Sequence, residues 1–170
     1  MKTPVIIGKL VFLFLLLSQT GCEPAALAPS NNCSNLLAIY APYAPVKIDI
    51  MPLTEVVFAN GAQGASQLKV YVSLVDSFDC QRKTPGMFRL ELYEYVQRSA
   101  DPKGRRVVVW PDIDLTDAAK NNEYWRDFFR AYEFNLDFTA QRKQSYILQV
   151  TCFCPNGKRL SNDFLLEHPK

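Results

Sequence analysis

Cysteine is the residue type with the clearest chemical potential in this chain. Four of its five cysteines, Cys33, Cys80, Cys152 and Cys154, follow residue 30. An even number of thiols favours disulfides when a chain is exported from the cytosol. Cys152 and Cys154 occupy alternate positions of one expected strand, where a stiff backbone disfavours a bond between them. We therefore expect Cys33 and Cys80 each to pair with one member of the Cys-Phe-Cys unit.

Metal and nucleophile chemistry have less support. The Cys-x-Cys spacing is not that of the usual zinc sites, and the single histidine, His168, lies in the C-terminal tail. A Ser-His-Asp or Cys-His hydrolase needs a histidine beside its nucleophile, which a residue so close to the chain end supplies poorly. We expect no catalytic residue, no cofactor and no metal ion at the cysteines.

An acidic loop offers a minor alternative for calcium. Asp112, Asp114 and Asp117 are close together, and carboxylate oxygens are the ligands that calcium prefers. The loop lacks the glycine and the distal glutamate of the twelve-residue calcium motif. The structural interpretation is that Thr116 or Asp117 caps a short helix.

Paired acids could in principle hydrolyse glycosides, a reaction that uses two carboxyl groups across a cleft. The pairs available here are Glu91 with Glu94 and Glu133 with Asp137. These acids lie on or directly after expected strands, at positions that favour outward faces, where charged side chains are ordinary solvated surface. The sequence therefore predicts a structural role for them.

The N-terminus has the layout of a signal peptide. Lys2 and Lys9 accompany an apolar run over 10–17, and no acidic residue occurs before Glu23. The run is far shorter than the roughly 20 residues of a transmembrane helix. We expect residues 1–21 to be removed from the mature protein.

Residues 19–22, Gln-Thr-Gly-Cys, resemble the lipobox of bacterial lipoprotein signal peptides, with Gln19 at the position where that family usually has leucine. The resemblance implies cleavage before Cys22, a lipid on its thiol and, with Glu23 next, sorting to the outer membrane facing the periplasm. More than one acyl chain would give a stable anchor. The alternative is plain secretion with cleavage near Ala26-Leu27-Ala28.

The mature chain divides into a tether and one domain. Residues 22–35 are rich in Pro, Ala, Ser and Asn, which predicts a lipidated tether, and 36–170 are long enough for one folded domain. Without residues 1–21 the chain has seventeen basic and seventeen acidic residues. This balance leaves no basic excess for binding nucleic acid.

Hydrophobic residues alternate with a period of two along most of the domain, which predicts about seven strands. The expected strands cover 46–58, 68–75, 88–93, 105–110, 132–139, 146–152 and 159–166. Pro52 places the first strand at an edge or splits it in two. The fold class is an all-β antiparallel sandwich, either immunoglobulin-like or transthyretin-like. In such a sandwich, the loop with Cys80 lies at the same end as Cys154.

One segment departs from the strand pattern. Aromatic residues at three- and four-residue spacing between Tyr124 and Tyr132 predict one or two helical turns. Such a stripe forms either a partner-binding face or, more commonly, a plug that closes one end of the sandwich.

These expectations favour a non-enzymatic accessory module of the cell envelope. The module would be anchored in the membrane by its lipid and would bind another envelope protein through its loops or a strand edge. Its layout is similar to that of lipid-anchored transthyretin-like lipoproteins of secretion machines. The alternative is a domain that binds a small ligand or carbohydrate through the loops at 76–82 and 110–122, which an exposed Trp110 would favour. A third possibility, an enzyme using carboxylates, would be revealed by a raised pKa on one acid.

Overall fold

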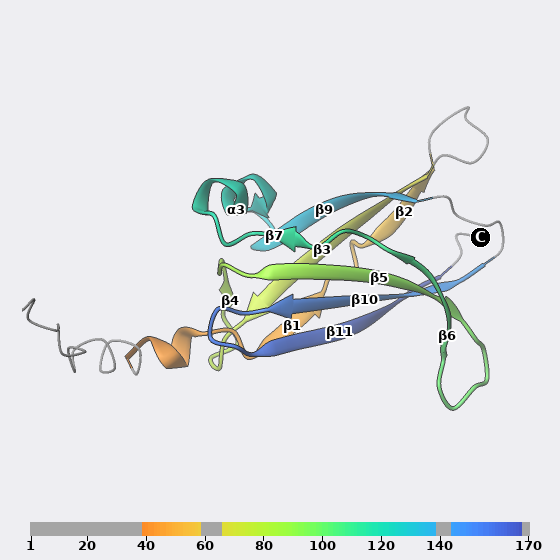
Figure 1. Cartoon of the computed structure of the whole chain (residues 1–170), viewed down its shortest axis with the longest axis horizontal. Coiled ribbons are helices and arrows are strands. Elements are labelled where there is room, and N and C mark those ends of the chain that lie inside the picture. The colour runs from red at the N-terminus through yellow and green to blue at the C-terminus, as the bar shows by residue number, and fades with distance from the viewer. Residues whose placement is uncertain (1–38, 59–65, 139–143, 168–170) are drawn as a thin grey trace, which may run out of the picture. The chain divides into compact units, whose positions relative to one another are not determined.

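The computed structural model describes residues 39–58, 66–138 and 144–167, which belong to the folded unit Ala38–Lys170. The predicted signal peptide, Cys22, the tether and Cys33 lie outside the described residues. As the alternation predicts, the domain is an all-β sandwich of two antiparallel sheets with one short helix (Figure 1).

The first sheet has the order β1-β3-β9-β8, and both β2 and β4 also pair with β3. Its strands are β1 (Lys47–Ile50), β2 (Glu55–Phe58), β3 (Ser66–Val75), β4 (Gln81–Arg82), β8 (Trp125–Arg126) and β9 (Ala131–Phe138). The two-residue strands β4 and β8 were not predicted, because a period of two is not visible over so short a length.

The second sheet has the order β11-β10-β5-β6, with β7 also pairing with β5. Its strands are β5 (Met87–Tyr95), β6 (Lys103–Val109), β7 (Ile113–Asp114), β10 (Tyr146–Phe153) and β11 (Arg159–Leu166). The two orders correspond to strands A-B-E-D and G-F-C-C′ of immunoglobulin-type sandwiches. The immunoglobulin-like alternative of the two predicted topologies therefore describes the strand pairing.

Pro52 splits the first predicted strand into β1 and β2, which pair with opposite halves of β3. Proline has no N–H to donate to a ladder, and it lies in the turn between the two strands. The buried Thr54 compensates, because its hydroxyl accepts a 3.1 Å hydrogen bond from the backbone N–H of Tyr71. The break in the strand thus leaves the neighbouring β3 backbone satisfied.

The residues predicted to face inward form the core between the sheets. The inward-facing side chains that the alternation predicts on β3, β5, β9 and β10 are buried, and on β3 and β10 several side chains of the other face, such as Tyr71, Val75 and Ile147, are buried as well. The largest side chains of this core are Tyr132, Phe88, Phe134, Leu68, Leu74, Leu90, Leu92 and Leu148. Burying a side chain of this size typically contributes about 1.5–3 kcal/mol to the free energy of unfolding.

Hydrogen bonds between side chains and backbone close both long edges of the sandwich. After β6, Trp110 donates from its indole Nε1 to the carbonyl oxygen of Asp137 on β9, at 3.0 Å. At the other edge, Asn162 of β11 donates from Nδ2 to the carbonyl oxygen of Ile48 on β1, also at 3.0 Å. Each bond joins the two sheets and satisfies a backbone acceptor that the strand ladder leaves open.

The aromatic segment is helical over only part of its length. Helix α3 (Ala118–Tyr124) begins at the predicted cap Asp117, whose carboxylate accepts the N–H of Lys120 at 2.9 Å. The prediction is wrong beyond Tyr124, because Trp125 has an extended backbone and pairs with Tyr132 in the β8–β9 hairpin. Aromatic spacing of three and four therefore arose from a hairpin that turns at residues 127–130.

The aromatic residues of this hairpin have two different environments. Tyr132 is fully buried, and its ring lies 5.1 Å from that of Trp125. Phe128, at the turn, is 93% exposed. Part of the stripe therefore packs against the core, where Tyr124 and Trp125 are partly buried, whereas Phe128 faces solvent.

Candidate functional site

A mostly apolar pocket of about 430 Å³ lies at one end of the sandwich. Three segments that are distant in the sequence form its walls: residues 40–45, residues 82–85 and the β10–β11 turn at 154–156. The first segment contains the 3-10 helix η1 (Ala41–Tyr43), which Figure 1 shows at the same end of the domain as β4. The strand order of the sandwich brings these segments together.

Asp76, which is buried at the end of β3, organises the second wall of the pocket. Its carboxylate accepts the N–H groups of Phe78 and Cys80, each at 2.9 Å, and the Nε of Arg82 at 2.6 Å. Burial by itself would raise the pKa of Asp76, but these hydrogen bonds outweigh it and hold the pKa below its ordinary value. The carboxylate is therefore ionised and fixes the β3–β4 turn.

Side-chain contacts attach η1 to this turn. The hydroxyl of Ser77 donates to the carbonyl oxygen of Pro42 at 2.9 Å. The guanidinium of Arg82 lies 5.3 Å from the ring centre of Tyr43, within the range of a cation–π contact. The Tyr43 ring is in turn 6.1 Å from that of Phe78. Tyr43 is nevertheless 51% exposed and Phe78 62% exposed, so much of this aromatic surface faces solvent.

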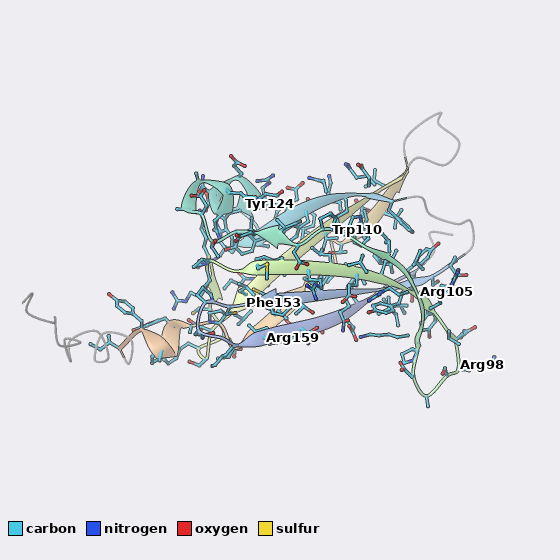
Figure 2. All side chains as sticks on the ribbon, in the orientation of Figure 1. Arg98, Arg105, Trp110, Tyr124, Phe153 and Arg159 are labelled. Carbon is cyan, nitrogen blue, oxygen red and sulfur yellow. The ribbon has the colours of Figure 1, made fainter. Side chains whose placement is uncertain are left out.

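The third wall contains the Cys-Phe-Cys unit. Phe153 lies on the outer face of its sheet, next to Arg159 of the neighbouring strand β11 (Figure 2). The guanidinium groups of Arg89 and Arg159 are 5.3 and 5.7 Å from its ring centre. Because side chains alternate along a strand, Cys152 and Cys154 both point inward. Their Sγ atoms are 4.0 Å apart, and both side chains are buried.

The two thiols share one hydrogen bond and have different acidities. That bond, together with burial, raises the pKa of the Cys152 thiol. The hydrogen bond with Cys152 lowers the pKa of Cys154 to about 7, against the effect of burial and with a further contribution from the charge of Lys158. The first proton that the pair loses therefore leaves from Cys154, whose thiolate lines the pocket.

The predicted disulfide between Cys80 and the Cys-Phe-Cys unit is wrong for the described residues. Cys80, Cys152 and Cys154 are all free thiols. Cys80 is exposed in the β3–β4 turn, and its thiol contacts the carbonyl oxygen of Phe78 at 3.7 Å, whereas Cys154 is buried against Cys152. The pairing predicted for Cys33 lies outside the described residues.

The structure does not bring the three carboxylates of the possible calcium loop together. Asp112 accepts two hydrogen bonds from Arg89, at 2.9 and 2.8 Å. Asp114 accepts the N–H and the hydroxyl of Thr116, and Asp117 caps α3. Within the described part of the chain, no group of three or more His, Cys, Asp or Glu side chains is arranged to hold a metal ion.

Three of the four paired acids that could have acted on glycosides are held by an arginine. Glu91 contacts Arg106 at 3.1 Å and Glu94 contacts Arg105 at 2.8 Å. Glu133 contacts Arg126 at 2.6 Å. Burial raises the pKa of Glu133, but the hydrogen bonds from Arg126 and Asn135 outweigh it and the pKa is lowered. Where a carboxyl pKa is shifted among the described residues, the shift is downward, opposite to that of a general acid.

Trp110 is buried, with 9% of its surface exposed, and its indole N–H is occupied by Asp137. It therefore offers no stacking surface for a sugar at the 110–122 loop. The other predicted ligand loop, at 76–82, does contribute Arg82 to the pocket.

Sequence reasoning missed Tyr40 and Tyr43, which line the pocket, and Phe78, whose ring lies beside that of Tyr43. Tyr40 and Tyr43 precede the first predicted strand, and Phe78 falls in a predicted loop, so none of them belongs to a periodic pattern. A signal was nevertheless present, because an aromatic residue within a polar turn is an exception to turn composition.

No helix among the described residues is long and apolar enough to cross a bilayer. No protein-family model matches the chain, and no curated protein matches it significantly.

Proposed function

We propose that this protein is a non-enzymatic accessory module of the cell envelope that binds another envelope protein through the end of the sandwich that contains the pocket. The observation that carries the proposal is the exposed aromatic surface of Tyr40, Tyr43 and Phe78, which we call the aromatic rim. Aromatic residues and arginine are enriched in protein interfaces, where they supply large contact areas at a small cost in conformational entropy.

The aromatic rim is held by polar contacts. Ser77 bonds to Pro42, and Arg82 is fixed by the buried Asp76 while it packs on Tyr43. A surface that is already ordered loses little conformational freedom on binding, which favours affinity. The rim is therefore better suited to recognition than Phe128, which is exposed at the β8–β9 turn and contacts the ring of Phe129.

Charge around the pocket indicates what the partner presents. Lys83 lines the pocket, and its Nζ donates to the amide oxygen of Asn122 at 2.5 Å. Its positive charge is not neutralised by a carboxylate among the described residues. We therefore propose that the partner places an apolar side chain in the pocket and an acidic group beside Lys83.

The proposed location rests on the N-terminal sequence. Residues 19–22 resemble a lipobox, and lipidation of Cys22 would attach the mature chain to the membrane, most simply the periplasmic face of the outer membrane. The predicted tether would then separate the lipid from η1, which begins the described part of the chain. This arrangement would let the aromatic rim contact proteins at or near the membrane surface.

The size of the pocket favours one alternative, a small ligand in place of a protein side chain. Its volume of about 430 Å³ lies in the range of small-molecule sites. Such a ligand would be apolar in the main, because the pocket wall is mostly apolar. The buried Trp110 counts against a carbohydrate at the neighbouring loops.

The test is to purify the tagged full-length chain from gently solubilised envelopes and identify its N-terminal peptide and its companions by mass spectrometry. We expect an acylated Cys22 and a stoichiometric companion protein. Tyr43→Ala and Phe78→Ala should lose the companion, whereas Phe128→Ala, which removes an exposed aromatic residue elsewhere, should retain it.

Three results would contradict parts of the proposal. An unmodified Cys22 would exclude the lipid anchor. Retention of the companion by both rim variants would place the interface elsewhere on the domain. Acylation of Cys22 without any companion protein, together with a small molecule that copurifies with the wild type and is lost from Tyr43→Ala, would favour the ligand-binding alternative.

A further inference from the structure

The two sulfur atoms of Cys152 and Cys154 have the separation of two ligands on one metal ion. With metal–sulfur bonds of about 2.3 Å, two thiolates on one metal ion have sulfur atoms about 3.8 Å apart in a tetrahedral complex and up to about 4.6 Å apart in a linear two-coordinate complex. The separation of Sγ atoms here is 4.0 Å. A disulfide needs a distance of about 2.05 Å between the two sulfurs. The sulfurs would therefore have to move much farther to form a disulfide than to bind one metal ion.

The fold reserves space for this pair of sulfurs. A Cβ atom at Gly86 would lie 2.9 Å from the Sγ of Cys152, so a glycine at this position leaves the room that the sulfur occupies. On the other side of the strand, Arg89 and Arg159 hold Phe153 and thereby keep both cysteines inward. The close approach of the sulfurs therefore depends on contacts from several strands.

We propose that Cys152 and Cys154 form a two-coordinate site for a soft monovalent metal ion of the copper(I) type. The ligand set selects this class of ion, because thiolates prefer copper(I), zinc or iron–sulfur clusters. Zinc requires four ligands, and no third His, Cys, Asp or Glu of the described residues joins the pair. Copper(I) is the member of this group that is satisfied by two sulfur ligands.

The surroundings favour the charge of such a complex. When the metal binds, each thiol releases its proton, so a monovalent ion with two thiolates has a net negative charge. Lys158 lies beside the site, because its carbonyl oxygen accepts the backbone N–H of Cys154 at 2.9 Å. Lys83 lines the same pocket as Cys154 and adds further positive charge to this end of the domain.

The pocket supplies a route to the site. Cys154 belongs to its wall, whereas Cys152 lies behind Cys154 and is fully buried. An ion that enters through the pocket meets Cys154 first, and Cys152 then completes the coordination. Burial of both sulfurs would keep the bound ion away from bulk water.

The test uses the reduced full-length chain under anaerobic conditions, titrated with copper(I) in competition with a chelator such as bicinchoninate. We expect one ion bound per chain and X-ray absorption that shows two sulfur neighbours. Cys154→Ser should weaken binding by at least ~100-fold, since even a residue outside the coordination shell typically changes metal affinity by 10–100-fold. Cys80→Ser and Cys33→Ser are the matched controls and should bind like the wild type.

Alkylation of the wild-type protein provides a second readout that no folding defect can affect. Copper(I) should protect Cys154, the thiol that lines the pocket, from iodoacetamide and leave Cys80 reactive, whereas zinc should give much less protection. Equal protection by zinc, unchanged affinity in Cys154→Ser, or loss of affinity in Cys80→Ser would overturn the proposal. So would isolation of the native chain with Cys152 or Cys154 in a disulfide. None of these results depends on the companion protein, so this proposal and the proposed function can fail separately.

Discussion

The carboxylate of Asp76 and the guanidinium of Arg82 form a 2.6 Å ion pair in which the acid is buried and the base reaches the surface. The pair joins the end of β3 to β4. Because Arg82 also packs on the ring of Tyr43, one buried charge supports the exposed aromatic rim. The stability of this end of the domain and the partner binding that we propose for it are thus connected through a single side chain.

The ionisation of Asp76 should make folding stability depend on acid pH. Its pKa in the folded state is below the ordinary value of 3.8. The ionised group therefore stabilises the fold above that value, and this contribution is lost as the pH falls through the folded-state pKa. Near neutral pH, Asp76→Asn should have a lower free energy of unfolding than the wild type. This difference in free energy should become smaller below about pH 4. Urea unfolding at a series of pH values measures it.

Asp79→Asn is the control for that experiment, since Asp79 lies in the same turn and is not a partner of Arg82. Asp79 has a positive φ of 58°, a conformation that asparagine also adopts readily. The control should keep the pH dependence of the wild type. If the free energies of unfolding of Asp76→Asn and the wild type differed by the same amount at every pH, the role assigned to the Asp76 charge would be contradicted.

Gly86→Ala should destabilise the domain by about 1–3 kcal/mol, because the added methyl group overlaps a packed core. The new Cβ would lie 2.9 Å from the Sγ of Cys152 and 3.3 Å from the carbonyl oxygen of Phe153. Removing the sulfur with Cys152→Ala should relieve part of that cost, so the two substitutions should be non-additive in a double-mutant cycle measured by urea denaturation.

Gly157→Ala provides the contrast in the same cycle. Gly157 has a φ of 79° and no neighbouring atom that an added Cβ would meet, so its cost comes from backbone conformation. Cys152→Ala should leave that cost unchanged. Additivity for both glycines would show that the sulfur does not limit the space at Gly86.

Tyr132→Phe should lower the free energy of unfolding by about 1–3 kcal/mol, the typical cost of leaving buried polar groups without a partner. The Tyr132 hydroxyl donates to the carbonyl oxygen of Thr84 at 2.7 Å and accepts the N–H of the same residue at 2.8 Å. Thermal or urea denaturation measures the change. Tyr40→Phe removes an exposed hydroxyl, and its free energy of unfolding should stay within about 0.5 kcal/mol of the wild type. If Tyr132→Phe and Tyr40→Phe lost the same free energy of unfolding, the buried hydroxyl would contribute nothing specific to stability.

In the metal-free reduced protein, the rate at which Cys154 reacts with iodoacetamide should rise with pH around a midpoint of about 7. Cys152→Ala should raise this midpoint most, because the hydrogen bond with Cys152 is the main cause of the lowered pKa. Lys158→Gln should raise it less. Both variants should therefore react more slowly at pH 7, as followed by peptide mass spectrometry, with Cys80 as the internal reference. A midpoint that neither substitution moves would contradict the origin assigned to the acidity of Cys154.

Local pattern was sufficient to predict the long strands and much of the core. Alternation identified β3, β5, β9, β10 and β11, because a strand with one buried face must repeat its apolar residues every second position. The same logic predicted the break at Pro52, since proline lacks the donor that a ladder needs. Asp117 was recognised as a helix cap because its side chain satisfies a backbone N–H within its own turn.

Residue spacing failed where a contact partner is distant in the sequence. The aromatic stripe suggested a longer helix, but Trp125 gains more from pairing with Tyr132 across a hairpin. Cys80 was expected beside Cys154 from their common end of the sandwich, yet the hydrogen bonds of Asp76 hold Cys80 in an exposed turn. The side-chain direction within a loop depends on such bonds, which no periodicity records.

The amino-acid sequence by itself determined the class of fold, the positions of the main strands and their inward faces, because these follow from local alternation and turn chemistry. It also supports the prediction of a lipidated N-terminus at Cys22. Only the tertiary structure decided that residues 40–45, residues 82–85 and Cys154 meet in one pocket, and that two buried sulfurs face each other at 4.0 Å. The physical reason is that the order of strands, which sets these neighbours, is chosen by the packing of the whole core.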